Sequence, residues 1–390
     1  MDETATRRRL LDLAQSEGFS LVRFAPATLV AEARVAARDR RANGELADMA
    51  WMTDEWLCRA TEPEAFLAGA RTLILLGLPY HSEDPAPPDD GAARGRIARY
   101  ARGRDYHRLF ESKLRRMVRT IREELGAEAR GTVDYGPLLE RPYAALAGLG
   151  WLGKSTMLLA PGFGPWVLLG AIATSLDVEP DVPLRKTCGS CTRCIVACPT
   201  GAISPQGDVL DARLCISYHT IENRGPIPRE LRASFGDWIF GCDDCLDACP
   251  VGGSNYAAHP DLEPKSLEDA RPELAALLDL DEATFAERFR GRAIMRAKRD
   301  GFVRNVCVAL GNVGTPADVN ALARALTDRS PLVRGHAAWA LGRLAERSPE
   351  AAPHARAQLL DAGPRESDAG VVEEISVALD ALQVKGLQGD

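Results

Sequence analysis

Cysteine is the residue type whose spacing most directly indicates chemistry in this sequence. Cys188, Cys191, Cys194 and Cys198 follow one another as C-x2-C-x2-C-x3-C, and Pro199 comes next. In bacterial two-cluster ferredoxins, three thiolates of such a run hold one 4Fe–4S cube and the fourth reaches a second cube. The spacing therefore predicts an iron–sulfur centre in this segment.

An incomplete second copy of the motif follows further along the chain. Cys242, Cys245 and Cys249 are spaced C-x2-C-x3-C and again precede a proline. Ile239 occupies the position of the missing first ligand, and Cys215 is the cysteine that lies between the two copies. With Cys215 as the substitute, eight cysteines supply two sets of four thiolates.

The ferredoxin crossover divides these eight thiolates between two 4Fe–4S clusters. Cluster one takes three ligands from the near motif and one from the far motif: Cys188, Cys191, Cys194 and Cys249. Cluster two takes the remaining four: Cys242, Cys245, Cys215 and Cys198. Zinc sites use ligand pairs separated by a spacer, and disulfides need an oxidising compartment, so both alternatives fit the compact doubled motif less well.

The segments that precede the cysteines alternate between helical and strand patterns. We expect helices at 5–17, 105–125 and 138–149, a further helix that ends near residue 41, and strands at 21–24, 70–78, 132–134 and 166–174. Such alternation predicts an α/β domain with one central sheet.

The chain after the cysteines carries an internal repeat. Residues 308–313 (VALGNV) and 339–344 (WALGRL) lie 31 residues apart, and 377–382 (VALDAL) form a looser third copy. Repeats of this kind predict a short helical array of HEAT type, whose units bury their apolar faces by stacking. A helical, charged stretch from about 263 to 299 connects it to the cysteine segment.

Length and composition are those of an ordinary globular protein. The 390 residues are 46% hydrophobic and 26% charged, which is typical of two or three domains with real cores. No stretch approaches the ~20 apolar residues of a membrane span, and no secretion signal follows the first arginines. We therefore expect a cytoplasmic protein, without a membrane partner, whose thiols hold metal.

The charge distribution is uneven. The formal net charge of −7 excludes a general electrostatic attraction to nucleic acid. Residues 94–119 nevertheless carry a surplus of eight positive charges, and residues 288–304 hold seven Lys/Arg against one aspartate. Each stretch is either a phosphate-contacting surface or a solvated helix face.

Asp134 is the candidate acid of the first domain. It stands at a predicted strand end before Gly136-Pro137, where a carboxyl could donate a proton if burial raises its pKa. The alternative is a turn residue or the N-cap of the next helix. Glu140 and Arg141 suggest a structural pair, and a lone histidine such as His107 is more often packed or solvated than catalytic. The glycine-rich loop at 148–154 lacks the spacing of a nucleotide-binding loop.

A series of short motifs runs through the chain in a fixed order. They are RYARGRDYH at 99–107, VD at 133–134, ERP at 140–142, GLGWLGK at 148–154, DVP at 181–183, CGSCTRC at 188–194, CISY at 215–218, GCD at 241–243 and AWALG at 338–342. Together these motifs closely resemble the epoxyqueuosine reductase (QueG) family over roughly residues 5–345.

The resemblance implies a cobalamin-dependent reductase that converts epoxyqueuosine to queuosine at the wobble position of tRNA. It implies a reductive-dehalogenase-like α/β domain for the cobalamin (1–179), a ferredoxin-like domain with two 4Fe–4S clusters (180–260), a helical connector (261–303) and HEAT-like repeats (304–390). Electrons would pass from an external low-potential donor through the clusters to cobalt, in a monomeric enzyme. The helical tail and the 94–119 face would hold the anticodon stem-loop through phosphates.

Carried over residue by residue, the resemblance makes Asp134 the acid that protonates the leaving oxygen. It also suggests cobalamin contacts from Ala98, Arg99, Asp134, Lys154 and Ser155. The sequence departs from the family pattern at two places: Tyr135 replaces a small residue, and Ser155-Thr156 follow Lys154 where many members have a histidine. A reductive dehalogenase-like corrinoid enzyme and a non-enzymatic ferredoxin module on a scaffold are the alternatives. The first usually has an export signal and no HEAT tail, and the second would bind no corrinoid.

Overall fold

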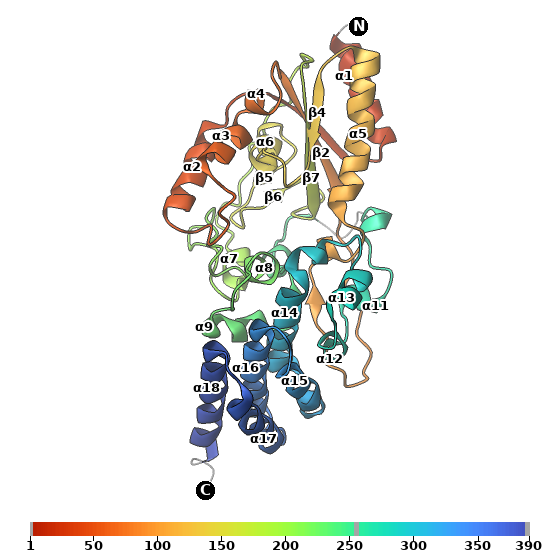
Figure 1. Ribbon diagram of the computed structural model, residues 1–390. Helices are drawn as coiled ribbons and strands as arrows, with labels where there is room; N and C mark the ends of the chain where they lie inside the picture. The colour runs from red at the N-terminus through yellow and green to blue at the C-terminus, as the bar shows by residue number, and fades with distance from the viewer. Residues whose placement is uncertain (1–2, 253–256, 387–390) are drawn as a thin grey trace. The chain divides into compact units, whose positions relative to one another are not determined.

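The computed structural model describes residues 3–252 and 257–386 and divides the chain into two compact units (Figure 1). The first unit comprises Met1–Glu83, Arg104–Arg213 and Asp243–Glu263. The second unit comprises Asp84–Gly103, Leu214–Cys242 and Pro264–Asp390. The chain passes between the units several times, and the four consecutive domains expected from the sequence stay a prediction.

A four-stranded antiparallel sheet forms the centre of the first unit. Its strands are β1 (Leu21–Pro26), β2 (Thr72–Pro79), β7 (Val167–Thr174) and β4 (Ala129–Thr132), in the order β1-β2-β7-β4. Every residue of β2 is buried, as its continuous apolar run predicts, because β2 is a central strand with both faces covered. The strand expected at 132–134 ends at Thr132, so Asp134 lies in the turn beyond it.

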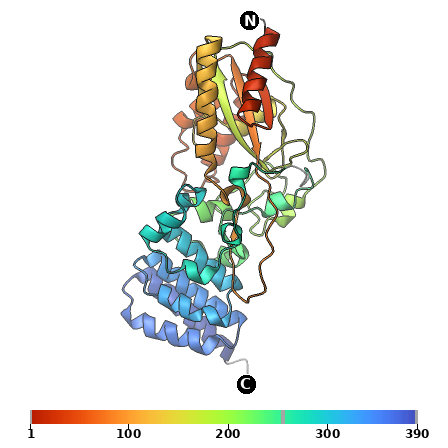
Figure 2. The ribbon, with the colours of Figure 1, turned by 90° about the vertical axis from the view of Figure 1, so that its right-hand side faces the viewer.

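Helices cover both faces of this sheet (Figures 1 and 2). On one face lie α1 (Glu3–Ser16) and α5 (Tyr106–Leu125). Leu109, Phe110, Leu114, Met117 and Ile121 form the buried stripe of α5, at the spacing that the sequence predicts. The α5 helix packs against β4 and β7, which brings its first turn to the end of the sheet where β4 stops.

The opposite face is covered by α6 (Glu140–Leu146), with α2 (Ala31–Ala42), α3 (Asp54–Thr61) and α4 (Pro63–Phe66) beside it. Tyr143 and Ala144 of α6 pack against Leu73 and Leu75 of β2. The rest of this unit consists of short elements. They are the β5–β6 hairpin (Trp151–Leu152 and Leu158–Leu159), α7 (Arg193–Ala197), α10 (Asp244–Asp247) and the 3-10 turn Pro260–Leu262.

The second unit is built on stacked helices. The long helices α14 (Lys298–Val313), α16 (Pro331–Arg347) and α18 (Ala369–Gly386) pack in sequence, as the three repeat copies predict. A Cβ at Gly311 would lie 2.7 Å from the Trp339 ring, and one at Gly342 would lie 2.8 Å from Ala378. The glycines of the two LG motifs therefore allow adjacent helices to approach closely.

Shorter elements complete this unit. The parallel pair β3 (Arg96–Ile97) and β8 (Trp238–Phe240) lies beside α8 (Ile216–Ile221) and α9 (Arg229–Arg232). The connecting helices are α11 (Leu267–Ala270), α12 (Leu274–Leu277), α13 (Glu282–Arg288), α15 (Val319–Ala325) and α17 (Ala352–Ala362). The 3-10 turns are Arg99–Ala101, Ala233–Phe235, Ala293–Ala297, Pro316–Asp318 and Gly363–Arg365.

Most basic side chains of the stretch at 288–304 bond to other groups of the protein. Arg299 bonds Asp328, and both side chains are less than 10% exposed. Arg304 is fully buried and donates hydrogen bonds to the carbonyl oxygens of His219, Asn223 and Gly225. Arg299 and Arg304 therefore hold the unit together from within, whereas Arg290 and Lys298 of the same stretch are exposed.

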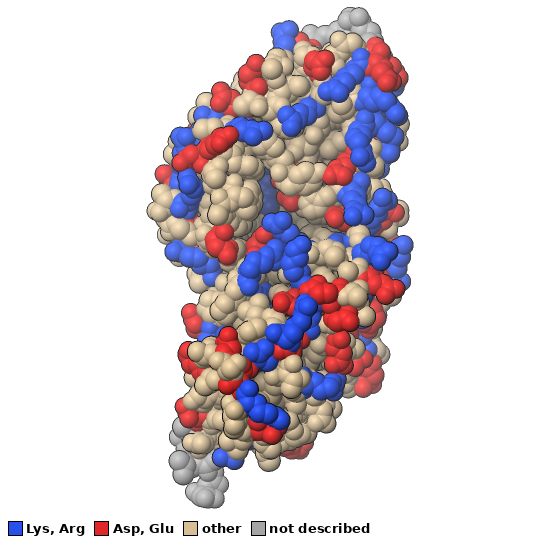
Figure 3. All heavy atoms as spheres, viewed as in Figure 1, with Lys and Arg blue, Asp and Glu red and all other residues tan. Residues whose placement is uncertain are grey.

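The basic stretch at 94–119 is divided between the two units. Its first part belongs to the second unit, where Arg99 and Arg102 are buried and pair with Asp84. The prediction of a continuous basic surface is therefore wrong for these two residues. On α5, by contrast, Arg108, Arg115 and Arg119 are exposed, and Figure 3 shows basic side chains gathered over this helix.

Among the described residues, no helix is both long enough and apolar enough to cross a lipid bilayer.

Candidate functional site

The four cysteines assigned to cluster one all lie in the first unit. Cys188 and Cys191 are joined by a turn in which the Cys191 N–H donates to the Cys188 oxygen at 3.0 Å. Cys194 lies in α7, and Cys249 follows α10, the helix that packs on α7. The near and far motifs thus meet in space, as the ferredoxin crossover requires.

The pKa shifts of two of these thiols include the charge of other cysteines in the set. Burial raises the pKa of the Cys194 thiol, and so do negative charges on Cys188 and Cys249. Burial also raises the pKa of Cys249, with further contributions from Cys188 and Cys191. Four thiolates in this arrangement repel one another until a cation binds them, which fits a metal cluster as their partner.

None of the ten cysteines forms a disulfide with another cysteine. In the described part of the chain, no three His, Cys, Asp or Glu side chains converge on a point where they could ligate a single ion. A 4Fe–4S cube takes one thiolate at each iron, so its ligands are spread around the cluster rather than gathered on one atom.

The cysteines assigned to cluster two are shared between the units. In the first unit, Cys198 accepts a hydrogen bond from the Ala202 N–H at 3.3 Å, and Cys245 lies in α10. In the second unit, Cys215 directly precedes α8 and Cys242 follows β8. This ligand set stays a prediction.

Asp134 lies in the turn after β4 with a left-handed backbone (φ +47°), and its side chain is 61% exposed. Its Oδ2 atom accepts a hydrogen bond from the Tyr106 hydroxyl at 2.9 Å and lies 3.0 Å from His107 Nε2. The turn approaches β4 so closely that a Cβ at Gly136 would lie 1.6 Å from Thr132 Oγ1. Only glycine fits there, and this close approach sets the position of Asp134.

His107 lies in the first turn of α5, between two carboxylates. Its Nδ1 atom is 2.7 Å from Asp105 Oδ1, and Asp105 also caps the helix by accepting the His107 N–H at 3.1 Å. The imidazole stacks on the Tyr106 ring with 4.0 Å between centroids. Burial alone would lower the pKa of His107, but hydrogen bonds and charge from Asp105 and Asp134 raise it to about 9.

Glu140, the first residue of α6, contacts the same turn. Its Oε1 atom accepts the backbone N–H of Asp134 at 2.5 Å. Burial, together with the negative charge of Asp134, raises the pKa of Glu140 to about 8. For Asp134 itself, burial acts to raise the pKa, but the bonds from His107 and Tyr106 outweigh it and the pKa is lowered.

The structure differs from what the sequence suggested about these residues. Burial acts to raise the pKa of Asp134, but the hydrogen bonds from His107 and Tyr106 and the charge of His107 outweigh it, so the pKa is lowered. His107 is neither simply packed nor simply solvated, since both ring nitrogens contact carboxylates. Glu140 bonds the Asp134 backbone, while Arg141 donates to the Thr156 oxygen at 3.3 Å. Asp134 does lie in a turn, as one of the two alternatives predicted, but it is not the N-cap of α6, which is Leu139.

The remaining predicted contact residues fall into two groups. Lys154 and Ser155 follow the β5 strand in the first unit; Ser155 is 5% exposed, and Lys154 Nζ donates to the Gly189 oxygen at 2.9 Å. Ala98 and Arg99 belong to the second unit, where Ala98 donates its N–H to Phe240 and Arg99 pairs with Asp84.

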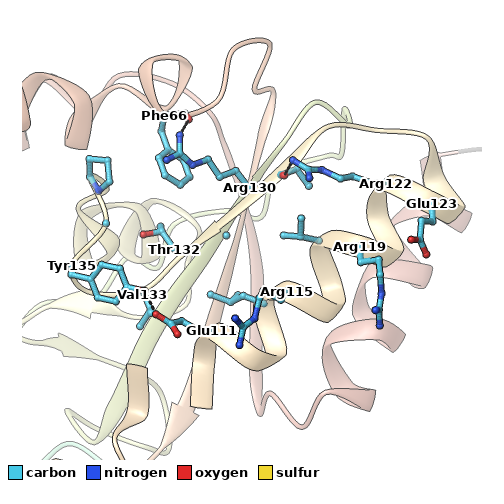
Figure 4. Close-up of a pocket in the computed structure, with 16 residues that line it drawn as sticks. Phe66, Glu111, Arg115, Arg119, Arg122, Glu123, Arg130, Thr132, Val133 and Tyr135 are labelled. Carbon is cyan, nitrogen blue, oxygen red and sulfur yellow. Dashed lines mark hydrogen bonds between the residues drawn. The ribbon is translucent and has the colours of Figure 1, made fainter. Parts of the chain in front are cut away.

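A groove of about 920 Å³ lies beside the Asp134 turn, between α5 and the edge strand β4 (Figure 4). Val133 and Tyr135, the two neighbours of Asp134 in sequence, line it together with Pro137 of the turn. Arginines from the helix and the strand also line the groove: Arg115, Arg119, Arg122 and Arg130.

The sequence and the fold both match known proteins. The family profile described as epoxyqueuosine reductase QueG (DUF1730) matches residues 60–135, a 4Fe–4S double cluster binding domain matches 187–252, and HEAT repeats match 292–374. The epoxyqueuosine reductase of Xanthomonas campestris pv. campestris is 38% identical over 347 residues, which cover 87% of this chain and 96% of that protein. The chain belongs to the epoxyqueuosine reductase family.

A second named relative and a solved structure agree with this assignment. The Escherichia coli K12 epoxyqueuosine reductase is 36% identical over 313 residues, covering 79% of this chain and 81% of that protein. A crystal structure of epoxyqueuosine reductase with an epoxyqueuosine-modified tRNA-Tyr stem loop superposes with a TM-score of 0.89. It is 28% identical and covers 98% of this chain and all of that one.

Membership of the epoxyqueuosine reductase family confirms several predictions made from the sequence. The multidomain α/β architecture, the double-cluster segment and the HEAT-type tail are all confirmed. The predicted class of enzyme is confirmed as well. The profile match ends at 135, so it contains Asp134, yet the roles of individual residues at this site stay predictions.

Sequence reasoning missed Tyr106 and His107 as partners of Asp134, and Asp105 as the partner of His107. One signal was present: an aspartate two residues before a histidine, at the start of a strongly amphipathic helix, predicts an N-cap that faces the histidine. Nothing local indicated that the turn after β4 would meet the other side of that imidazole.

Proposed function

We propose that this chain reduces the epoxide of epoxyqueuosine in the wobble position of a tRNA anticodon to give queuosine, with Asp134 as the proton donor. The observation that carries the proposal is that the same chain contains a double-cluster segment and an exposed carboxylate, Asp134. The neighbour of this carboxylate, His107, is protonated. The named activity of the relatives supports the substrate.

The reaction requires two electrons and two protons. The epoxide oxygen leaves as water, and the ring carbons regain the double bond of queuosine. The 4Fe–4S clusters pass electrons one at a time, at the low potentials that such clusters reach. We propose an external low-potential donor in the cytoplasm, where thiolates remain reduced, and a monomer as the working form.

We propose cobalamin as the cofactor that accepts these electrons; when bound, it supplies a cobalt centre able to deliver two electrons to carbon. The β5–β6 hairpin offers features that suit such a group. Leu152 is 48% exposed, and the buried Trp151 Nε1 has no acceptor within the described parts of the chain. Lys154 and Ser155 follow directly, and Ala98 and Arg99 are the proposed contacts from the second unit.

Asp134 is placed to act on a substrate oxygen. Its two bonds from protein side chains both go to Oδ2. No described residue donates to Oδ1, and more than half of the side chain is exposed. Oδ1 can therefore reach an incoming ligand while Oδ2 stays held by the protein, a geometry that suits a general acid.

The test is an anaerobic conversion assay. Protein reconstituted with iron, sulfide and cobalamin is supplied with dithionite and epoxyqueuosine-containing tRNA, and the digested tRNA is analysed by mass spectrometry. The expected result is queuosine at a rate that depends on cobalamin. Absence of conversion, with both clusters present and reduced, would reject the proposed function.

A further inference from the structure

The residues around Asp134 form a continuous line of hydrogen bonds that ends at the solvent side of α5. Asp105, His107 and Asp134 follow one another at 2.7 Å and 3.0 Å. All three lie in the first unit, and the line crosses from the cap of one helix to the turn after one strand.

The hydrogen-bond partners establish the protonation state of the imidazole. Ionised carboxylates accept hydrogen bonds and cannot donate them. Because each ring nitrogen of His107 faces a carboxylate oxygen, both nitrogens must carry a hydrogen to avoid a contact between lone pairs. His107 is therefore an imidazolium, held between two anions.

Charged and aromatic groups from α5, from the turn and from α6 surround His107 and Asp134. On α5, Tyr106 stacks on the imidazole, and Arg108 acts on Asp105. From the turn, the Tyr135 ring lies 5.6 Å away. From α6, Arg141 acts on Asp134, and Glu140 bonds its backbone. The two carboxylates next to the imidazole outweigh the cations, which agrees with a His107 pKa of about 9.

An anionic Asp134 cannot protonate a leaving oxygen, so a proton must first reach it. We propose that His107, held by Asp105, is the proton reservoir that supplies Asp134 during catalysis. This inference rests on the proposed function. His107 acts through Asp134 and does not itself touch the substrate, so it is a positioning and proton-supplying residue.

Each proton that the relay donates is replaced by one from water. The Nε2 hydrogen of His107 transfers to Asp134 Oδ2, which lies 3.0 Å from Nε2, and the protonated carboxyl group then turns and gives that same proton to the departing oxygen. His107 is left neutral and, being 26% exposed, takes the next proton from water, after which Asp105 again stabilises the cation. Two such transfers accompany the two electrons from the external donor, and the oxygen leaves as water.

The position of Asp105 explains how His107 regains its proton. A neutral imidazole that keeps its Nδ1 hydrogen still bonds Asp105 and presents a free lone pair at Nε2. The carboxylate of Asp105 thus fixes one tautomer and raises the basicity of the other nitrogen. An isolated histidine with an ordinary pKa of 6.5 would be largely neutral at neutral pH and would supply few protons.

The first test is a titration that needs neither cofactor nor substrate. The chain has six histidines, so NMR of protein labelled at histidine can follow each imidazole with pH, and the His107→Gln variant assigns the signal. We expect His107 to titrate near 9 in the wild type and closer to 6.5 in both Asp134→Asn and Asp105→Asn. A wild-type value near 6.5 overturns the proposal.

The second test measures single-turnover rates against pH in fully reduced holoenzyme. The wild-type rate should hold through neutral pH and fall above about 9 as His107 loses its proton. In His107→Gln the rate at neutral pH should fall by about 10²-fold or more and should rise as the pH is lowered, because Asp134 then takes its proton from water. Added imidazole should restore part of the rate in His107→Ala.

Matched variants separate this role from a structural one. His354→Gln makes the same change at an exposed histidine of α17 and should behave as wild type. Asp105→Asn keeps a good helix cap and should shift the alkaline limb to lower pH. A slower His107→Gln enzyme with an unchanged pH profile and no imidazole rescue would mean a structural role and overturn the relay. Failure of the wild type itself to convert tRNA rejects the proposed function, while the titration still reports on the relay.

Discussion

The cysteine segment and the Asp134 site hold charge in opposite ways. Cys194 and Cys249 have pKa values raised by burial and by neighbouring thiolates, so the protein alone disfavours their charged forms. Asp134 has a lowered pKa because His107 and Tyr106 stabilise its anion. The cysteines depend on a metal cluster for their charge, whereas the acid site is complete within the polypeptide.

Because of this difference, mutations in the cysteine segment and at the Asp134 site should have different consequences. A lost cysteine removes a cluster ligand and leaves the other three thiolates without a complete cofactor. A change near Asp134 leaves the clusters in place and alters only how a proton is stored and moved. Electron supply and proton supply should therefore fail independently of each other.

The largest effect is expected from Cys249→Ser. Loss of the ligand contributed by the far motif should remove cluster one, cut the iron content by about half and abolish turnover. Iron analysis and electron paramagnetic resonance of the reduced protein measure it. Cys58→Ser, at a free cysteine in α3, is the control and should keep full iron content. A Cys249→Ser protein with two intact clusters would contradict the assigned ligand.

Asp134→Asn should give the next largest effect. An amide cannot donate a proton as a carboxylic acid does, so turnover should fall by about 10²–10⁴-fold. The iron content and the binding of the tRNA stem-loop, followed by fluorescence anisotropy, should not change. If binding is lost together with turnover, Asp134 is a contact residue and the separation between the two regions does not hold.

Tyr106→Phe should have a moderate effect. The change removes the hydroxyl that donates to Asp134 Oδ2 at 2.9 Å and keeps the ring that stacks on His107. A hydrogen bond to a charged group contributes about 1.5–3 kcal/mol, so the turnover rate should change by roughly 10- to 100-fold. Steady-state rates at constant pH provide the measurement, and a wild-type rate would show that His107 alone holds the carboxylate.

The smallest effect is expected from Glu140→Gln. With a pKa of about 8, Glu140 is mostly protonated below that pH, and glutamine has nearly the same shape. Rates at pH 6–7 should stay within about twofold, because the amide oxygen can still accept the Asp134 N–H. The two enzymes should diverge only above pH 8, where wild-type Glu140 ionises beside Asp134. A tenfold loss at pH 6 would make Glu140 a second proton source.

The cysteine segment and the repeat tail could be predicted because their information is local. Four ligands within eleven residues, and a six-residue motif repeated after 31 residues, are patterns that survive without knowledge of the fold. Helix α5 was predictable for the same reason, since its apolar residues recur at 3–4 residue intervals. Strand β2 was predictable as a buried strand from its continuous apolar run.

The acid site could not be predicted because it depends on long-range packing. Asp134 meets His107 only because α5 packs on β4 and the turn at Gly136 folds against Thr132. The same limit applies to charge: seven basic residues at 288–304 suggest a surface, yet Arg304 lies fully buried among carbonyl oxygens. Neither sheet pairing nor the partners of a buried charge can be read from neighbours in sequence.

The most direct test of the central claim follows both regions at once. Wild-type and Asp134→Asn holoenzymes are reduced and mixed with epoxyqueuosine stem-loop in the absence of excess reductant. Samples are then analysed for the cluster signal by electron paramagnetic resonance and for queuosine by mass spectrometry. The wild type should lose its reduced-cluster signal as queuosine forms, and Asp134→Asn should bind the RNA but keep its clusters reduced. Queuosine formation by Asp134→Asn at the wild-type rate would contradict the account.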